Sequence, residues 1–452
     1  MSGLGDRARS ESGWEGEVFE VRLGASGHGG FCVARYEGRV LFVRHGLPGE
    51  LVRALITEDR GKSFCRADAI EILEPSADRV PATCPVSGPG GAGCCDFSFA
   101  TPRAQRALKA AVVAEQLRRV AGWETEVQVE PIPVGGNVFG SDRGAPDGPD
   151  AAAGSADTGA WRTRIRLVVD SHGRPGVHRY RSTDVLADLR CPQPVPGAID
   201  GLAERTWTPG AELVVAVDGD GIRHVVELAP TRQQARRGGD RPSTAARRSA
   251  AHTARSERVV MGSGRAVQYV AGRRWEVSAT GFWQPHIGAA QCYSDIVAEW
   301  ADAAPGALAW DLYSGAGVFA ARLADQVGPG GAVRGVESAR SAVADGTAAL
   351  RDLPQVDLTA QRVERWLDDQ TGPPPQVVVL DPPRAGAGKD VVAALASHAP
   401  TRIVHIGCDP ASFARDIALY RTAGYHPTHL RAFDAFPTTH HIEALALLEP
   451  TH

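Results

Sequence analysis

The sequence predicts an α/β protein whose C-terminal part is a doubly wound parallel sheet, preceded by a small β-barrel and a central α+β region. Apolar runs such as ALAWDLY, QVVVLDPP and RIVHIG alternate with segments of helix length after about residue 273. Buried parallel strands read as such continuous apolar runs. Residues 16–74 instead show short β-rich runs separated by glycine turns, which is typical of a small barrel.

Length and composition restrict the class of protein. The 452 residues are enough for two to four domains. The N-terminus MSGLGDRARSESGWEGE is polar and no run of about 18 apolar residues occurs, so we expect a cytoplasmic protein with no membrane partner. The eight irregularly spaced cysteines favour metal or catalytic use over a disulfide framework. The net charge of -4 gives no global basic field, so any surface that binds nucleic acid must be local.

The domain organisation follows from shifts in composition along the chain. We expect a barrel over 10–74, a central domain over 75–272 and the doubly wound domain over 273–452, acting as a monomer. Two segments of the central domain, 138–160 and 231–258, are predicted from their composition to be disordered insertions, and the first is low in aromatic residues and rich in Gly, Ala, Asp and Pro. The second carries eight arginines and only two acidic residues, so it is either a mobile arm that binds RNA phosphates or a solubilising linker.

The barrel stretch GHGGFCVARYEGRVLFVRHGLPGE resembles the TRAM domain, an OB-like RNA-binding barrel. The resemblance implies that Arg35, Arg44, His45 and Arg53 contact phosphates and that Phe31 offers a stacking surface. A solvated barrel with scattered arginines is the alternative.

The run WDLYSGAGVFA places a ligand site after the first parallel strand. Asp311 ends the strand, Gly315 and Gly317 allow a tight turn, and a helix starts near Val318. Glu337 ends the next strand, where acidic residues bond ribose hydroxyls. Because a third spaced glycine is lacking, the pattern favours S-adenosylmethionine over a dinucleotide.

Two further strand ends carry polar groups. Asp381 closes the run QVVVLDPP, where a carboxylate points into the cleft rather than serving packing, and Cys408 follows RIVHIG. Cys408 is either buried filling or a thiol that attacks a substrate. A thiol beside a methyl donor predicts covalent activation of an unreactive acceptor such as C5 of uracil, with Glu443 as the general base. The alternative for Glu443 is a pairing with His440 or His441.

The runs LDPPRAG, HIGCDPASFARD and AFDAFPTTHHIEALALL together resemble the TRAM-domain, class I S-adenosylmethionine-dependent uracil-5 RNA methyltransferase family. The two strands predicted at the C-terminus also fit this class. The resemblance implies that Cys408 is the nucleophile and Glu443 the proton acceptor. It also implies contacts to S-adenosylmethionine from Gln284, Tyr313, Glu337 and Asp381. The family commonly has an Asp near the adenine where this chain has Arg362.

Four cysteines are similar to the iron–sulfur ligands of many family members, which would give this chain a 4Fe–4S cluster held by Cys84, Cys94, Cys95 and Cys191. The spacing departs from the family pattern, since Cys94 and Cys95 are adjacent and Ala92 replaces the first Cys of a CxxC pair. A loop with buried thiols and no cluster, or a zinc site of four thiolates, are the alternatives.

The function expected is methylation of C5 of a uridine in ribosomal or transfer RNA. The rival is an RNA-binding protein with an inactive methyltransferase-like domain. A DNA cytosine-5 methyltransferase is disfavoured, because its cysteine follows a proline after the fourth strand, whereas Cys408 follows the fifth. A small-molecule methyltransferase would not need the barrel.

Overall fold

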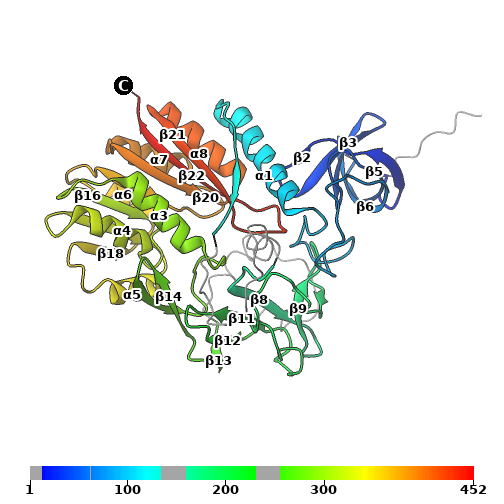
Figure 1. Cartoon of the computed structure of the whole chain (residues 1–452), viewed down its shortest axis with the longest axis horizontal. Helices are drawn as coiled ribbons and strands as arrows, with labels where there is room; N and C mark the ends of the chain where they lie inside the picture. Colours follow the sequence, from blue (N-terminus) through cyan, green and yellow to red (C-terminus); the bar gives the residue numbers. More distant parts are fainter. Residues whose placement is uncertain (1–12, 62, 134–158, 231–254, 452) are drawn as a thin grey trace, which may run out of the picture.

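The computed structural model describes residues 13–61, 63–133, 159–230 and 255–451. The barrel and the large parallel sheet lie at opposite ends of the molecule, with the central strands below and between them (Figure 1). Most of the two predicted insertions, 138–160 and 231–258, lies outside the described residues. Of the second, Arg255 and Arg258 are described and pair with Glu212 and Glu227, and Glu257 already begins a strand.

The N-terminal barrel is a six-stranded sheet in the order β1-β5-β6-β4-β3-β2. Alternating burial along its strands follows the alternating apolar residues of the sequence, which places the small core of the barrel on one face. Its strands are β1 (Val18–Arg22), β2 (Ser26–Gly27), β3 (Phe31–Tyr36), β4 (Arg39–Arg44), β5 (Leu51–Asp59) and β6 (Phe64–Glu74). The predicted barrel is confirmed.

The middle of the chain contains a second six-stranded sheet, in the order β10-β9-β8-β11-β12-β13, and a separate hairpin. The sheet strands are β8 (Arg164–Val169), β9 (Pro175–His178), β10 (Val185–Leu186), β11 (Glu212–Val217), β12 (Arg223–Leu228) and β13 (Glu257–Met261). The hairpin consists of β14 (Arg265–Val270) and β15 (Arg273–Ser278).

The C-terminal part is an eight-stranded sheet in the order β18-β17-β16-β19-β20-β22-β21-β7. Strands β16 to β20 are parallel, and β22 pairs antiparallel with both β20 and β21, so the two strands at the C-terminus form the antiparallel pair that the sequence predicts. The strands are β16 (Leu308–Leu312), β17 (Ala332–Glu337), β18 (Val356–Ala360), β19 (Val377–Leu380), β20 (Arg402–Gly407), β21 (Tyr425–Asp434) and β22 (Glu443–Pro450). The helices between them are α4 (Val318–Val327), α5 (Arg340–Ala349), α6 (Val363–Asp368), α7 (Gly388–Ser397) and α8 (Pro410–Thr422).

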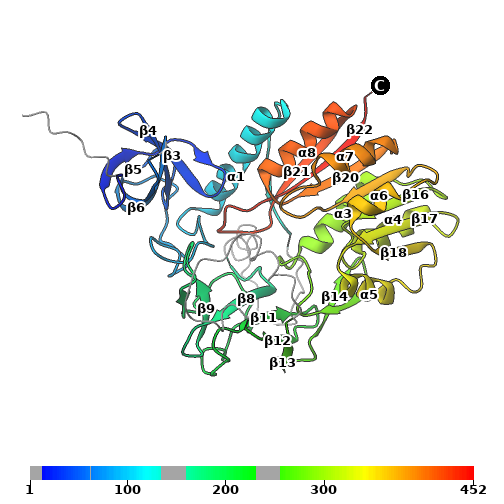
Figure 2. The ribbon, with the colours of Figure 1, turned by 180° about the vertical axis from the view of Figure 1, so that it is seen from behind.

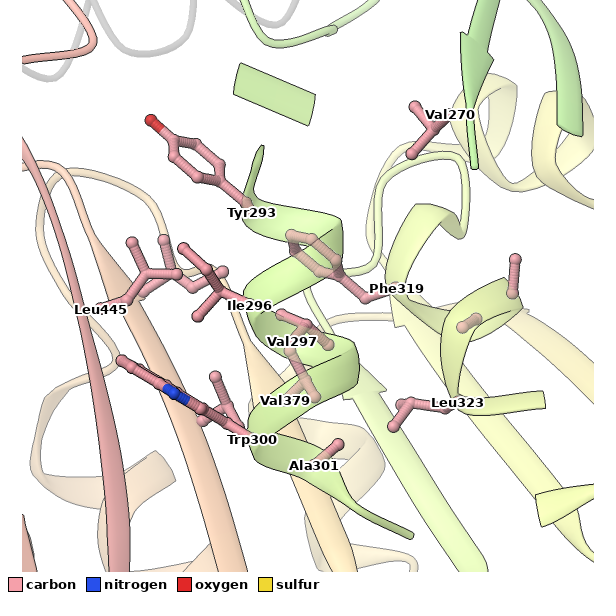
Figure 3. Packing of buried hydrophobic residues seen from close by; sticks show 14 of the residues in the cluster. Val270, Tyr293, Ile296, Val297, Trp300, Ala301, Phe319, Leu323, Val379 and Leu445 are labelled. Atoms are coloured by element: carbon pink, nitrogen blue, oxygen red, sulfur yellow. The ribbon is translucent and has the colours of Figure 1, made fainter. Parts of the chain in front are cut away.

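Helix α3 (Ala289–Ala301) precedes β16 and covers one face of this sheet. Its buried residues recur at helical spacing, and in Figure 3 Ile296 and Trp300 point towards the strand that carries Leu445. A second cluster of buried residues, from α6, α7 and α8, covers the opposite face. The sheet is therefore doubly wound, as the sequence predicts.

Two elements of the predicted central domain join the C-terminal sheet instead. Strand β7 (Val129–Pro131) pairs in parallel with β21, and α1 (Pro102–Gln116) lies beside α8 (Figure 2). A π-helical turn (Leu117–Ala121) continues α1, and Leu117 belongs to the same core as α8. The pairing of β7 with β21 crosses the predicted boundary at residue 273, and the boundaries at residues 75 and 273 stay predictions.

A buried ion pair ties α1 to the end of β21. Lys109 Nζ lies 2.5 Å from Asp434 Oδ1 and 3.0 Å from the carbonyl oxygen of Phe436, and both charged side chains are buried. Burial lowers the pKa of Lys109, and the charge of Asp434 opposes this effect. Asp434 is the last residue of β21, so the ion pair lies where the loop 435–442 towards β22 begins.

We expect Lys109→Ala to lower the free energy of unfolding by about 3–5 kcal/mol, because it leaves the charge of Asp434 buried without its partner. Urea denaturation followed by circular dichroism measures the change. Lys109→Met combined with Asp434→Leu removes both charges and should recover most of the loss. A single variant as stable as the wild type would contradict this account.

No helix among the described residues is long and apolar enough to cross a membrane. The cytoplasmic location and the monomeric state stay predictions.

Candidate active site

The carboxyl ends of the parallel strands meet at one edge of the sheet, where ligands bind in doubly wound folds. A cavity of about 750 Å³ opens at this edge. Its wall includes all six predicted catalytic and cofactor-binding residues, namely Gln284, Tyr313, Glu337, Asp381, Cys408 and Glu443.

The turn between β16 and α4 has the backbone conformation that the glycines predict. Gly315 and Gly317 have φ of +54° and +77°, and Tyr313 also lies in the left-handed region at +61°. A Cβ at position 317 would lie 2.9 Å from Leu350 Cδ1, so a side chain there would clash. A Cβ at position 315 would meet no atom within 4 Å, so the backbone is open to a ligand on that side.

Asp311 lies behind this turn and does not line the cavity. Its Oδ2 accepts a hydrogen bond of 2.8 Å from the backbone N–H of Ala320 in the first turn of α4. Burial raises the pKa of Asp311 to about 8. Its role is to anchor the start of the helix.

Two acidic residues of the cavity wall, Glu337 and Asp381, accept hydrogen bonds from their neighbours. Glu337 accepts hydrogen bonds from the backbone N–H groups of Gly315 at 3.3 Å and Ala339 at 2.7 Å, which fixes its carboxylate beside the glycine turn. Asp381 accepts a hydrogen bond of 3.3 Å from the side-chain amide of Gln284. Burial raises the pKa of Asp381 to about 7.

Cys408 lies between the end of β20 and the start of α8, half-buried in the cavity wall. Burial, together with the charges of Glu443 and Asp381, raises the pKa of its thiol to about 12, and the charge of Arg384 opposes this rise. The following residue, Asp409, caps α8 by accepting hydrogen bonds from the N–H groups of Ala411 and Ser412. The turn predicted after Cys408 and the helix beyond it are confirmed.

Glu443 is the first residue of β22 and is 4% exposed. Its Oε2 is buried with no hydrogen-bond partner among the described residues. Burial and the charge of Asp381 raise its pKa well above the usual range. The histidines proposed as alternative partners are engaged elsewhere, since His440 contacts Asp96 at 2.5 Å and His441 contacts Arg384 at 3.4 Å.

The pH dependence of alkylation tests the environment of Cys408. Since its thiol pKa is raised to about 12, the thiolate fraction should climb about tenfold per pH unit from about pH 7 to 10 without levelling off. Iodoacetamide labelling of the Cys408 peptide, followed by mass spectrometry, measures this rate. Glu443→Gln removes a carboxylate whose charge raises the thiol pKa, so it should speed labelling at the pH values at which Glu443 is ionised. A plateau near pH 8 in the wild type would contradict the assignment.

Among the cavity residues that sequence reasoning did not assign to the site are Arg162, Arg384, Phe436 and His441. Burial and the charges of His440 and Arg384 lower the pKa of His441 to about 3, so this ring is neutral at pH 7. Arg384 directly follows Asp381-Pro-Pro and was within reach of motif reasoning. Arg162 precedes β8 and has no signal in the sequence. Arg362, at the position of the commonly found Asp, also lines the cavity.

Two of the predicted phosphate contacts of the barrel are wrong. Arg44 is 7% exposed and pairs with Asp96 at 2.7 Å, and His45 is equally buried. Burial and the charge of Arg44 lower the pKa of His45 to about 4, so the ring carries no charge at pH 7. Arg35 and Arg53 are exposed, although Arg53 pairs with Glu71 at 2.7 Å.

The four predicted metal ligands lie together, away from the wall of the active-site cavity. Cys95 is at the centre, and contacts of its thiol with Cys191, Cys84 and Cys94 raise its pKa far above the usual range. The contact with Cys95 lowers the pKa of Cys84 to about 7. No group of three or more His, Cys, Asp or Glu side chains in the described part of the chain has the arrangement of a metal site. The expected 4Fe–4S cluster, and the alternative zinc site, are therefore not supported in the part of the chain that the structure describes.

A doubly wound sheet that ends in an antiparallel strand pair, with a cavity at its carboxyl edge, defines a class I methyltransferase. The TRAM domain model matches residues 14–69, and the tRNA (uracil-5-)-methyltransferase model matches residues 374–451. An uncharacterized RNA methyltransferase of Streptomyces avermitilis is 41% identical over 96% of this chain and 99% of its own length. The chain therefore belongs to the TRAM-domain RNA (uracil-5) methyltransferase family.

Further similarities extend over nearly the whole chain. The 23S rRNA (uracil(1939)-C(5))-methyltransferase of Alkalilimnicola ehrlichii is 29% identical over 96% of this chain and 97% of its own length. The crystal structure of Pyrococcus abyssi tRNA (uracil-54, C5)-methyltransferase with S-adenosyl-L-homocysteine has a TM-score of 0.64. The match covers 95% of this chain and 100% of the Pyrococcus abyssi chain, at 18% sequence identity, which shows that the two share a fold.

Proposed function

We propose that this enzyme transfers a methyl group from S-adenosylmethionine to C5 of a uridine in ribosomal or transfer RNA. One observation carries the proposal: Cys408 and Glu443, whose Oε2 is buried without a hydrogen-bond partner in the described part of the chain, line the same cavity as the glycine turn after β16. The first two groups have the chemistry that activation of uracil needs, and the turn has the open backbone that a nucleoside needs. The names of the relatives support RNA as the partner.

The cavity fits S-adenosylmethionine, because Gly315 leaves its backbone open and the carboxylate of Glu337 is fixed beside it. Glu337 would accept hydrogen bonds from the ribose hydroxyls, and Tyr313 would contact the nucleoside. Gln284 and Asp381 would hold the polar end of the molecule. When bound, S-adenosylmethionine supplies an electrophilic methyl group.

The chemistry of the chain's own residues begins at Cys408. Its thiolate adds to C6 of the uracil ring, forming a C6–S bond and moving electron density to C5, which then becomes the nucleophile that accepts the methyl group. Glu443 removes the C5 proton, and the resulting electron pair expels the thiolate by breaking the C6–S bond. Arg384 stabilises the thiolate, since its charge opposes the rise in the pKa of Cys408.

A deletion strain tests the proposed activity and identifies the substrate. Nucleoside mass spectrometry of its ribosomal and transfer RNA should show 5-methyluridine missing at a position that is methylated in the parent strain. Expression of the wild-type gene should restore it, whereas the gene encoding Cys408→Ala should not. Unchanged 5-methyluridine at every position would contradict the proposal and favour the rival, an RNA-binding protein with an inactive domain.

A further inference from the structure

Two sets of polar contacts connect the N-terminal barrel with the turn after Cys408 and the loop before Glu443. Figure 1 shows the barrel next to α1 and close to the loop between β21 and β22.

The first contact reaches the turn after Cys408. His28 lies in the turn between β2 and β3. Its Nε2 atom is 3.1 Å from Oδ2 of Asp409. The other carboxylate oxygen of Asp409 caps α8, so one side chain joins the barrel to the residue that follows the nucleophile. Hydrogen bonding to Asp409 raises the pKa of His28, and hydrogen bonding to His28 helps to lower that of Asp409, whose pKa is about 2. The contact is therefore favoured as a pair of charges.

The second contact reaches the loop before Glu443. Arg44, at the end of β4, donates a hydrogen bond of 2.7 Å to Asp96 Oδ1, and Asp96 Oδ2 lies 2.5 Å from His440 Nδ1. Asp96 is 4% exposed. Gly30 of the barrel packs against both partners, because a Cβ there would lie 3.0 Å from Asp96 and 3.2 Å from His440.

The loop is also held from the residues that follow Asp96. The N–H of Phe97 donates to the carbonyl oxygen of Thr438 at 2.8 Å, and the Gln105 side chain accepts from the N–H of Thr438 at 2.7 Å. Thr438 has φ of +67°, a strained conformation that these contacts maintain.

We propose that the barrel is a positioning element of the active site, in which His28 fixes the nucleophile turn through Asp409, and Arg44 fixes the base loop through Asp96 and His440. This inference rests on the proposed function for the roles of Cys408 and Glu443. Binding of RNA to the barrel would then act directly on both loops, and a barrel detached from them would leave the two groups misplaced. A misplacement of about 1 Å is enough to slow a reaction by orders of magnitude.

The first bridge is tested with His28→Ala, Asp409→Asn and the double variant. An asparagine at this position can still cap α8 but carries no charge towards His28. The Asp409→Asn variant therefore tests the ion pair without removing the helix cap. The rate of covalent trapping is measured at saturating bulk RNA from cells treated with 5-fluorouracil. In that RNA the fluorine at C5 cannot leave as a proton does, so the adduct persists. Each single variant should trap about tenfold more slowly, with an unchanged KM for bulk RNA from a deletion strain.

The double variant should be no slower than the slower single variant, because both changes remove the same contact. His28→Arg, which keeps a cation, should recover most of the rate. Arg22→Gln removes an exposed barrel pair with Glu74 and serves as the matched control with wild-type kinetics. A raised KM with an unchanged rate, or additive losses in the double variant, would overturn the first bridge.

The second bridge is tested with His440→Gln, which should slow a different step. Addition of Cys408 should proceed at the wild-type rate, whereas release of methylated RNA should slow, so that ordinary RNA gives a transient adduct. Release at the wild-type rate would overturn this bridge.

A measurement without RNA separates this inference from the proposed function. Loss of the His28 contact should loosen the turn and speed iodoacetamide labelling of Cys408 at least about threefold, as expected when a half-buried thiol becomes more accessible. A wild-type protein that neither methylates RNA nor forms an adduct would contradict the proposed function, while the labelling comparison still decides the inference. Equal labelling of wild type and His28→Ala would overturn it.

Discussion

Replacing Cys408 by Ala is expected to abolish RNA methylation, with a loss of at least about 10⁴-fold, because among the described residues of the cavity wall Cys408 is the only thiol that could form the bond to C6. Transfer of a radioactive methyl group from S-adenosylmethionine to bulk RNA of a deletion strain measures the loss. The affinity for S-adenosylmethionine, measured by calorimetry, should stay unchanged, because the thiol reacts with the uracil base and not with S-adenosylmethionine.

Cys292→Ala is the matched control, because Cys292 is also half-buried, lies on α3 and does not line the cavity. It should keep full activity. Retained turnover in Cys408→Ala would rule out the covalent mechanism, and a loss of S-adenosylmethionine binding would show that the cysteine has a structural role.

Replacing Glu443 by Gln is expected to stop the reaction after the methyl group has been transferred. Gln has the shape of Glu but cannot remove the C5 proton, so addition of the thiolate can occur while the C6–S bond cannot break. The variant should accumulate an RNA–protein adduct that survives denaturing electrophoresis. The amide also fits the buried site without the cost of an unpaired charge.

The double variant of Cys408→Ala and Glu443→Gln should form no adduct, which shows that the trapped bond is to Cys408. Normal turnover of Glu443→Gln, or inactivity without trapped RNA, would require another base. Asp381 is the group to examine next, because it lies in the same cavity and burial raises its pKa to about 7.

The catalytic half of the cavity was predictable because it depends on strand ends. A continuous apolar run predicts a buried parallel strand, and parallel strands of one sheet bring their carboxyl ends to the same edge. Residues that follow such runs, as Glu337, Asp381 and Cys408 do, must then lie near one another. Glu443 was chosen because the covalent scheme needs a general base and not by this strand-end rule, since it begins an antiparallel strand.

The cysteine cluster shows the limit of spacing as a guide. The sequence brought Cys84, Cys94, Cys95 and Cys191 together as candidate ligands, and their thiols do lie in contact. Thiols that lie close together do not by themselves form a metal site, because the donor atoms of a metal site point towards one shared centre. The adjacent Cys94 and Cys95 give a cluster around Cys95 instead.

By itself the sequence determined the barrel, the doubly wound sheet, the glycine turn and the identity of the strand-end residues, because each depends on local periodicity and on rules of strand connection. Only the tertiary structure decided which charges meet across the chain. Lys109 and Asp434 lie 325 residues apart in the sequence, and the contacts of His28 with Asp409 and of Asp96 with His440 are also long-range. Such pairs have no periodic signal, since their partners are set by how separate elements pack, and burial rather than residue type makes each one strong.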